Sequence, residues 1–510
     1  MNGGWMKKYS FSKKDIEQIK EMGLTPSDVH QQLEAFRNGS LFLQLIRPCT
    51  PGDGIRSFTP AKRSRLMKLY DTEAGKYKIV KFVPASGAAS RMFAAWFAAA
   101  MLGGFGNDRL DRSFLANLRK MPFYSLLEKD QTVRFMIKQK NVKALLDYIL
   151  SSGLQFGSLP KALIPFHAYL NSEIRTALEE HLGEAAGFIA DEKGICHLHF
   201  TVSKEHEKAV RAQLKLVISR YEKRLGVRFA IDLSNQSPAT NILAVDEDNL
   251  PFRDDCGRLV FRPGGHGALL ENIQALDADL IFVKNIDNIA PDALQKRILS
   301  YKKVLGGLAL QLRQSVFAHL RSLEKEPLSS GELKTIAEFC RSELQASLPK
   351  GFSKLTAAEK GQRLFQLLNR PLRVCGMVKN EGEPGGGPFW VQENDQSQTL
   401  QIVESAHVNH KRISQTKIWS RSTHFNPVDM VCCTKNYRGE KLKLADFVNR
   451  DAYLISPKTE KGRKLKAQEM PGLWNGGMAY WNTVFVELPL TVFNPVKTVY
   501  DLLRPQHRGG

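Results

Sequence analysis

The sequence predicts a mixed α/β fold with a mainly parallel sheet, and three observations predict it. Short runs rich in β-branched and aromatic residues alternate with long stretches of helical periodicity. The first such run, Tyr77–Val83, ends in the small-residue turn Pro84–Gly87, and a helical pattern follows at once. The composition, 43% hydrophobic and 25% charged, is that of a globular chain and excludes a disordered or fibrous one.

The elements fall into an order that separates an N-terminal part from the α/β part. Apolar residues at helical spacing predict a helical N-terminal extension over residues 1–76. We expect one α/β domain over 77–505, with helical inserts at about 93–158 and 292–370. Further strands are predicted at Ile195–Val202, Arg228–Asp232, Asn241–Val245, Leu280–Val283, Cys375–Val378, Leu400–Val403, Ala452–Ile455 and Thr483–Leu488.

Charge and cysteine content narrow the class of protein. The chain has no apolar run long enough to cross a bilayer and no apolar N-terminal segment, so we expect a soluble, cytoplasmic protein without a membrane partner. Its seven cysteines form no C-x-x-C pair, which favours reduced thiols. The net charge of +21 would suit nucleic acid, an anionic membrane surface or phosphorylated substrates, and charge alone does not choose among them. Because the basic residues are spread along the chain and mixed with acids, we expect a solvated face, with nucleic acid an unlikely partner. The oligomeric state stays open.

The first candidate site is the turn after the first predicted strand. Small residues there would let backbone N–H groups approach an anion at a helix N-terminus, although strand–helix packing explains the alanines equally well. The chain contains no Walker A motif, so it is not a P-loop protein. The turn consists of Ser86, Gly87, Ala88, Ala89 and Ser90, followed by Arg91.

The second candidate site lies around the strand that precedes Asn285–Asn288. A loop with Gly265 and His266 leads into a helix, and the strand after that helix ends in Asn-Ile-Asp-Asn. A carboxylate just past a buried strand can stay ionised and bind a hard cation, so Asp287 is a candidate magnesium ligand. A plain Asx turn is the alternative at this position.

Taken together, these motifs resemble the UDP-sugar pyrophosphorylases, and the chain is similar to an uncharacterised, mostly bacterial branch of that nucleotidyltransferase superfamily. The strand end Asn-Ile-Asp-Asn matches the family letter for letter. The other similar segments occur in the family's order over roughly Tyr77 to Leu503. They are Ser86–Met92, Leu159–Ile164, Leu233–Pro238, Pro263–Ala268, Ile402–Val408, Phe425–Asp429 and Asn494–Leu503.

The resemblance implies a Rossmann-like sheet of the nucleotide-diphospho-sugar transferase (GT-A-like) type and an enzyme that joins a nucleoside triphosphate, expected to be UTP, to a sugar 1-phosphate. It implies magnesium as the cofactor and a role for each matching residue. Arg91, Lys161 and Lys497 would neutralise phosphate charge, and Asp287 would hold the metal. Nucleotide contacts would come from the 86–90 turn, Gln236, Gly265 and His266, and sugar contacts from Glu404 and Asn426.

The sequence also departs from the family, and two other functions stay open. Ser86 and Ala89 replace family glycines, and a Cβ there would crowd phosphates, while Asp429 replaces an Asn of the sugar loop. A glycosyltransferase of similar architecture is one alternative, because Asp277-Ala278-Asp279 has its metal-binding spacing. A non-catalytic protein that binds nucleotides or nucleic acid is the other, and it would fit the basic charge.

Overall fold

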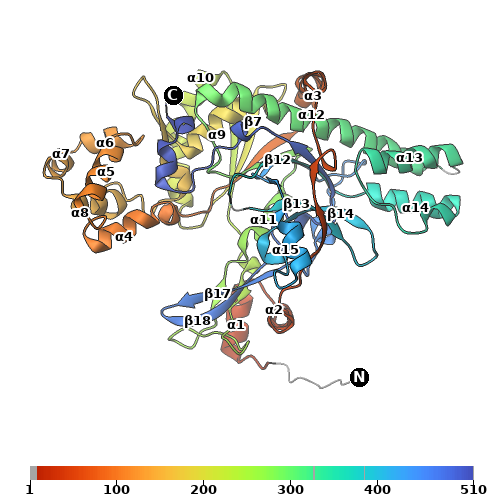
Figure 1. Cartoon of the computed structure of the whole chain (residues 1–510), viewed down its shortest axis with the longest axis horizontal. Helices are drawn as coiled ribbons and strands as arrows, with labels where there is room; N and C mark the ends of the chain where they lie inside the picture. The colour runs from red at the N-terminus through yellow and green to blue at the C-terminus, as the bar shows by residue number, and fades with distance from the viewer. Residues whose placement is uncertain (1–8, 326–327, 384, 509–510) are drawn as a thin grey trace.

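The computed structural model describes residues 9–325, 328–383 and 385–508, and a mixed sheet runs through its centre (Figure 1). The sheet has ten strands in the order β2-β3-β19-β12-β16-β11-β4-β7-β8, and β15 pairs with β12 off this path. The bounds are β2 (Thr50–Pro51), β3 (Gly54–Arg56), β4 (Ile79–Pro84), β7 (Ile195–Thr201), β8 (Arg228–Ser234), β11 (Leu280–Lys284), β12 (Leu372–Lys379), β15 (His424–Phe425), β16 (Asp429–Cys433) and β19 (Asn482–Glu487). Along the order, only the two pairings made by β16 are antiparallel. The predicted mainly parallel sheet is therefore confirmed.

Strand direction decides where a ligand can bind. β11 and β12 are both antiparallel to β16, so they point the same way. β4 is parallel to β11, and β19 is parallel to β12. The carboxyl ends of these strands therefore lie at one edge of the sheet, which is where open α/β sheets bind their ligands.

Both faces of the central strands are buried. In β4, Ile79 and Val83 face one hydrophobic core, and Val80 and Phe82 face another, as the period of two requires. Burial on both faces explains why these strands are almost continuously apolar. The first core also holds residues of α3 (Pro60–Glu73), α9 (Ala177–Ala186), α10 (Glu207–Leu225) and α12 (Asp292–Leu323), and the second holds residues of α11 (Leu269–Ala275).

A network of buried charges interrupts the first core. Lys81 of β4 and Lys284 of β11 both pair with the carboxylate of Glu184, and Lys302 of α12 pairs with Asp429. All of these side chains are almost fully inaccessible to solvent. Burial lowers the pKa of Lys81 to about 7, because the nearby carboxylate of Glu184 offsets only part of the desolvation cost. Lys284 is the last residue of β11, so the network reaches the carboxyl end of that strand.

Helices project on opposite sides of this sheet (Figure 1). Residues 93–158 form a small bundle at the left of that view, and the C-terminal half of α12 extends to the right with two further helices. Among the described residues, no helix has both the length and the apolar character needed to span a bilayer. The bounds are α4 (Ala94–Leu102), α5 (Asp108–Leu118), α6 (Tyr124–Glu128), α7 (Gln131–Lys138), α8 (Val142–Asp147), α13 (Ser330–Ser342) and α14 (Ala357–Leu368).

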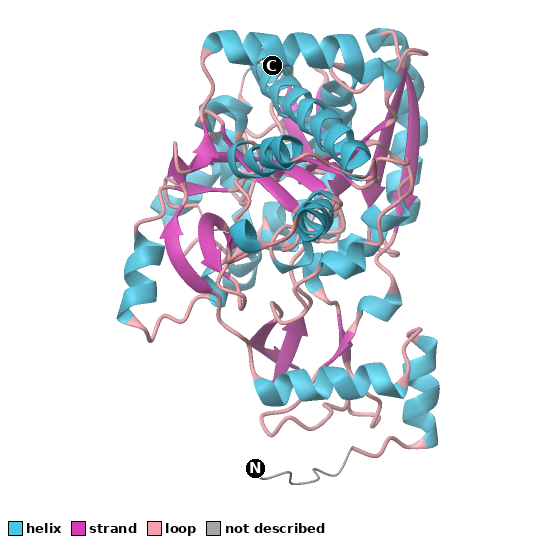
Figure 2. Ribbon diagram, turned by 90° about the vertical axis from the view of Figure 1, so that its right-hand side faces the viewer, coloured by secondary structure: helices cyan, strands magenta, loops and turns pink. Residues whose placement is uncertain are grey.

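Short antiparallel pairs complete the fold, and α1 and α2 lie with some of them at the lower end of the molecule (Figures 1 and 2). The helices are α1 (Lys13–Glu21), α2 (Pro26–Asn38) and α15 (Ile413–Ser420). The strands outside the main sheet are β1 (Gln44–Pro48), β5 (Pro165–Ala168), β6 (Ile174–Thr176), β9 (Ile242–Leu243), β10 (Phe261–Arg262), β13 (Gly387–Gln392), β14 (Gln398–Val403), β17 (Leu454–Glu460) and β18 (Arg463–Glu469). They form the pairs β9–β10, β17–β18 and β5–β6 and the sheet β1-β13-β14.

The range 1–76, for which the sequence predicts a helical extension, contains strands as well as helices. Its first eight residues lie outside the described part of the chain. β1 pairs with β13, and β3 adds to the main sheet beside β19. Hydrogen bonds to residues more than 300 positions away select this conformation, so local periodicity does not reveal it.

Candidate active site

The candidate site lies at the carboxyl ends of β4 and β11, where segments from distant parts of the chain meet. The segments 84–92, 159–163, 285–288 and 494–499 contact one another through backbone hydrogen bonds. The bonds are Lys161 N–H to Gly87 O, Ala89 N–H to Leu159 O, Ile286 N–H to Pro84 O, Val496 N–H to Asp287 O and Val499 N–H to Met92 O, at 3.0–3.3 Å. The main chain itself therefore assembles the site.

Asp287 is the centre of this arrangement. Its Oδ2 accepts hydrogen bonds from Lys161 Nζ at 2.9 Å and from Lys497 Nζ at 3.3 Å. The Lys161 ammonium also donates to the carbonyl of Val496, at 2.9 Å. Asp287 is only 8% exposed, whereas 46% of the Lys497 side chain is accessible. Lys497 therefore lies where a solvent-borne anion could reach it.

The electrostatics of Asp287 keep it ionised. Burial alone would raise the pKa of its carboxyl, but the charges and hydrogen bonds of Lys161 and Lys497 outweigh burial and hold the pKa below its usual value. Its other oxygen, Oδ1, is buried and has no hydrogen-bond partner among the described residues. An ionised carboxylate with one free, buried oxygen can accept a cation.

The turn after β4 offers backbone donors beside these lysines. Within the described residues, the N–H groups of Ser86, Gly87 and Ala88 donate to no protein acceptor. Ala89 is fully buried in the hydrophobic core, and its N–H donates to the Leu159 carbonyl. Ser90 and Arg91 are exposed at the end of the turn.

A second cluster joins the loop of Gly265 to Glu404. His266 stacks on the Trp474 ring with 4.1 Å between centroids, and its Nε2 lies 3.7 Å from Glu404 Oε1. Glu404 in turn accepts a hydrogen bond from Asn475 Nδ2 at 2.7 Å. Burial lowers the pKa of His266, so the imidazole is neutral at physiological pH. Two predicted positions, His266 and Glu404, are thus brought together.

The loop at His266 depends on glycine where other segments approach closely. Gly265 adopts φ +75°, a conformation that side chains disfavour. A Cβ on Gly267 would lie 2.2 Å from the carbonyl oxygen of Pro471, and one on Gly264 would lie 2.3 Å from that of Thr240. The loop therefore packs against the segments that carry Trp474 and Gln236.

Gln236 is half-buried in the segment that follows β8. The amide of Asn272, on α11, holds this segment by donating to Ser234 Oγ at 2.8 Å and to the Asn235 carbonyl at 2.9 Å. His199 contacts the same hydroxyl, at 2.7 Å. The segment that carries Gln236 is thus held at the carboxyl edge of the sheet.

Asn426 is engaged within the fold. Its amide donates to the Gly376 carbonyl at 2.9 Å, and its Oδ1 accepts from the N–H of Val428 at 3.1 Å. Val428 adopts φ +57°, which is rare for a β-branched residue, so Asn426 holds a strained turn. Asp429, which aligns with the sugar loop in sequence, is buried in β16 and pairs with Lys302. The side chain that replaces the family's Asn at this position is therefore part of the buried charge network.

The sequence did not single out several residues that shape the site. Asn475 and Trp474 position Glu404 and His266, and Asp501 accepts from the N–H groups of Lys497 and Thr498 at 2.8 and 2.7 Å. Thr498 and Asp501 form a capping box, a pattern of spacing that is readable in sequence. Asn475 and Trp474 carry no such signal, because their contacts are distant in the chain.

The aspartates at 277 and 279 lie elsewhere. They precede β11, at the amino edge of the sheet, and their carboxylates pair with lysine and arginine side chains. Lys435 contacts Asp277 at 2.9 Å, and Arg313 contacts Asp279 at 3.4 Å. These contacts do not support the metal site of a glycosyltransferase.

Comparison with known structures defines the class of fold. The uridine diphosphate N-acetylglucosamine pyrophosphorylase of Trypanosoma brucei is similar, with a TM-score of 0.50 and 12% identity over 97% of this chain and 79% of that one. The UDP-glucose pyrophosphorylase of Leishmania major has a TM-score of 0.45, at 12% identity over 97% of this chain and 79% of its own. The expected resemblance to UDP-sugar pyrophosphorylases is therefore confirmed at the level of the fold.

The family itself follows from the sequence. Residues 12–508 match the family described as "Domain of unknown function (DUF4301)", and the chain belongs to that family. No curated protein matches it.

Proposed function

We propose that the protein transfers a nucleotidyl group from a nucleoside triphosphate, with UTP as the expected donor, to a sugar 1-phosphate and releases pyrophosphate. The observation that carries the proposal is the pairing of Asp287 with Lys161 and Lys497 beside free N–H groups of the 86–88 turn. Cations and backbone donors grouped around one point can bind two polyanionic substrates next to each other and offset the repulsion between them. The fold shared with the trypanosomal pyrophosphorylase supports the same reaction class.

In this reaction an oxygen of the sugar phosphate attacks the α-phosphorus. The P–O bond to the β-phosphate breaks, and pyrophosphate leaves with the electron pair of that bond. Lys497, the more exposed lysine, would bridge the incoming phosphate and the α-phosphate, and Lys161 would neutralise the triphosphate. Arg91, exposed at the end of the turn, would bind the departing β- and γ-phosphates.

One side-chain oxygen among the proposed site residues is suited to bind a magnesium ion. Asp287 Oδ1 is buried without a hydrogen-bond partner among the described residues, and a hard cation takes such oxygens. The described residues contain no group of three or more metal-ligating side chains, so substrate phosphates and water would complete the coordination. When bound, the ion would neutralise developing charge on the phosphates.

The remaining predicted residues would select the substrates. Gln236 and the backbone of Gly265 would contact the base, and His266 would lie near the ribose or the α-phosphate. Glu404 would accept hydrogen bonds from sugar hydroxyls, because Asn475 uses Oε1 and leaves further acceptor capacity on the carboxylate. Asn426 would contribute through its backbone carbonyl or its remaining amide hydrogen, since both ends of its amide and its backbone N–H already bind the fold.

The test is pyrophosphate release by the purified protein with magnesium, over a grid of nucleoside triphosphates and sugar 1-phosphates. Lys497→Ala is the test variant, and Lys458→Ala, which removes an exposed lysine of β17, is the matched control. Release that requires one triphosphate, one sugar phosphate and Lys497 supports the proposal. If no substrate pair gives pyrophosphate release but UTP stabilises the protein against heat, the protein binds nucleotides without catalysing this reaction.

A further inference from the structure

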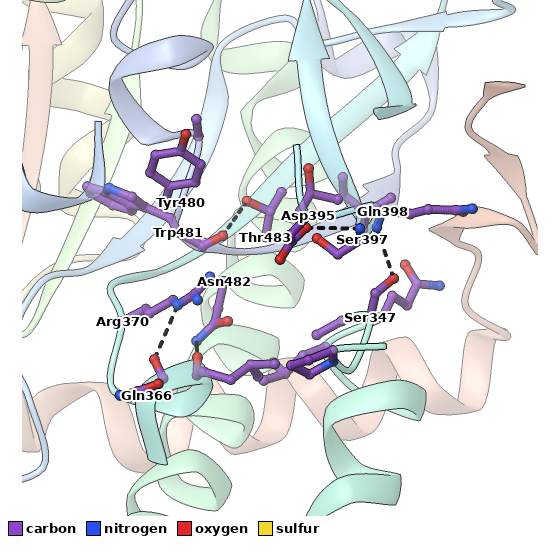
Figure 3. A pocket seen from close by; sticks show the side chains of 18 of the residues that line it. Ser347, Gln366, Arg370, Asp395, Ser397, Gln398, Tyr480, Trp481, Asn482 and Thr483 are labelled. Carbon is purple, nitrogen blue, oxygen red and sulfur yellow. Dashed lines mark hydrogen bonds between the residues drawn. The ribbon is translucent and has the colours of Figure 1, made fainter. Parts of the chain in front are cut away.

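Figure 3 shows side chains that line a polar cavity. The cavity adjoins Asn482 and Thr483, the first residues of β19, which runs in the same direction as β12 and β11, so it lies at the edge of the sheet opposite to Asp287. Its volume is about 210 Å³. The walls come from α14, the segment 344–349, the turn between β13 and β14, and residues 479–483. The cavity is therefore separate from the candidate active site.

Arg370 is the charged group that distinguishes this cavity. It is half-buried at the end of α14, and its Nε donates to the Gln366 carbonyl at 3.2 Å. Among the described residues, no carboxylate lies within 4.0 Å of its guanidinium. Figure 3 shows the side chain extending from the α14 side toward Asn482, in the middle of the cavity. The terminal nitrogens of Arg370 therefore have no protein acceptor in the described part of the chain.

The surroundings of Arg370 make an unpaired guanidinium costly. Burial lowers its pKa, and the carboxylates of Glu393 and Asp395 offset only part of that effect from a distance. Oδ1 of Asp395 accepts from the N–H of Ser397 at 2.9 Å, and the carboxylate forms no ion pair with the Arg370 guanidinium. A partly desolvated cation without a partner favours an anion from solution.

One residue of the cavity wall has a strained backbone. Gln345 adopts φ +51°, an uncommon backbone conformation that local structure must hold in place. Strained backbone residues cluster at ligand-binding sites, and Gln345 lies on the 344–349 wall of this cavity.

The remaining wall is rich in hydroxyl and amide groups, which hydrogen-bond neutral polar atoms. They belong to Ser347, Ser397, Gln398, Thr399, Tyr480 and Asn482. The volume is below the roughly 300–1,000 Å³ typical of cofactor and drug sites, so the ligand is small. A guanidinium pairs best with the planar or tetrahedral oxygens of carboxylate or phosphate.

We propose that this cavity binds a small polar molecule that carries an oxyanion, with Arg370 as its ion-pair partner. The oxyanion is a phosphate or a carboxylate. The site does not depend on the proposed transferase activity, because none of the residues assigned to that activity lines the cavity.

The experiment is isothermal titration calorimetry of the full-length protein with inorganic phosphate and, separately, with malonate, at constant ionic strength. The variants are Arg370→Gln, Arg370→Lys, the active-site variant Lys497→Ala, and Arg112→Gln as a matched control on exposed α5. We expect saturable binding of at least one anion. Arg370→Gln should weaken it by about tenfold to a hundredfold, as expected for a charge-assisted hydrogen bond, and the other two positions should leave it unchanged. Binding of phosphate would identify the oxyanion of the ligand as a phosphate, and binding of malonate would identify it as a carboxylate.

A second measurement needs no variant and covers the case in which Arg370→Gln fails to fold. Hydrogen exchange of the wild-type protein with and without the anion should show slower exchange in residues 344–349 and 395–400. No saturable binding of either anion overturns the proposal. Arg370→Lys, which keeps the positive charge, should bind more tightly than Arg370→Gln. Binding that is lost in Lys497→Ala but kept in Arg370→Gln also overturns the proposal, because the anion would then occupy the candidate active site.

Discussion

The ammonium of Lys161 lies 2.9 Å from Oδ2 of Asp287, although the two residues are 126 positions apart in the chain. The same oxygen accepts from Lys497, a further 210 positions along. The carboxylate is thus shared by two cations, one shielded and one open to solvent. This arrangement predicts that the two lysines contribute differently to stability and to turnover.

Lys497→Ala should abolish most activity and leave the fold intact. The side chain is 46% accessible, so its loss should change the free energy of unfolding by no more than about 0.5 kcal/mol. Removal of a preorganised charge at the reacting phosphate should lower kcat about 10²- to 10³-fold. Steady-state pyrophosphate release and urea unfolding check both parts. A wild-type rate would show that Lys497 has no role in the reaction.

Asp287→Asn should impair both activity and stability. Lys161, whose side chain is 13% exposed, would lose its ionic partner, and a buried donor without a charged acceptor costs about 1–3 kcal/mol. We expect the free energy of unfolding to fall by that amount in urea titrations monitored by circular dichroism. An unchanged free energy of unfolding would show that the ion pairs of Asp287 with Lys161 and Lys497 do not stabilise the fold.

Acid should remove the contribution of Asp287 to stability. The folded pKa lies below the usual value of 3.8, so the contribution is fully present above pH 3.8 and is lost as pH falls through the folded pKa. The difference in unfolding free energy between wild type and Asp287→Asn should be constant from about pH 5 to 7 and shrink below about pH 4. A difference that grows in acid would contradict the assignment.

Asn475→Ala should affect the sugar substrate more than the triphosphate. Its amide donates to Glu404 at 2.7 Å, and this bond orients the carboxylate. Loss of one such hydrogen bond should raise the KM for the sugar 1-phosphate about threefold to tenfold. Kinetics with each substrate varied in turn test this. An equal rise in both KM values would instead indicate a general disturbance of the site.

Gly307→Ala should destabilise the contact between α12 and α3. A Cβ on Gly307 would lie 2.1 Å from the carbonyl oxygen of Leu66, so the helices must move apart. The overpacking should cost about 1–3 kcal/mol despite the better helix propensity of alanine. Gly331→Ala in α13 is the matched control, because the nearest atom there, Ser329 Oγ, is 3.9 Å from the added Cβ. Thermal unfolding of both variants gives the comparison.

The sequence predicted the buried central strands of the sheet better than it predicted the short strands β1 and β3. Tyr77–Val83 and Leu280–Val283 are apolar, β-branched runs, and the structure has β4 and β11 there. Strong local patterns of this kind survive in the fold. β1 and β3 could not be predicted in the same way, because their partners β13 and β19 are far away in sequence.

The site was predictable in part through motif resemblance. That resemblance placed Asp287, Lys161 and Lys497 among the important residues, and the structure brings them into contact. No pattern could show that Asp429 pairs with Lys302, because burial and the partner's position exist only in the folded chain. The contact of Asn475 with Glu404 could not be predicted for the same reason.

The junction of segments 159–163, 285–288 and 494–498 also links substrate binding to the completeness of folding. No contiguous stretch of the chain contains the site, and closing loops of more than a hundred residues costs chain entropy that local contacts cannot repay. A partly folded molecule therefore does not contain a smaller but working form of this site. Any ligand that engages both lysines selects the fully assembled chain and stabilises it by mass action, so ligand affinity reports the fraction of molecules that have finished folding.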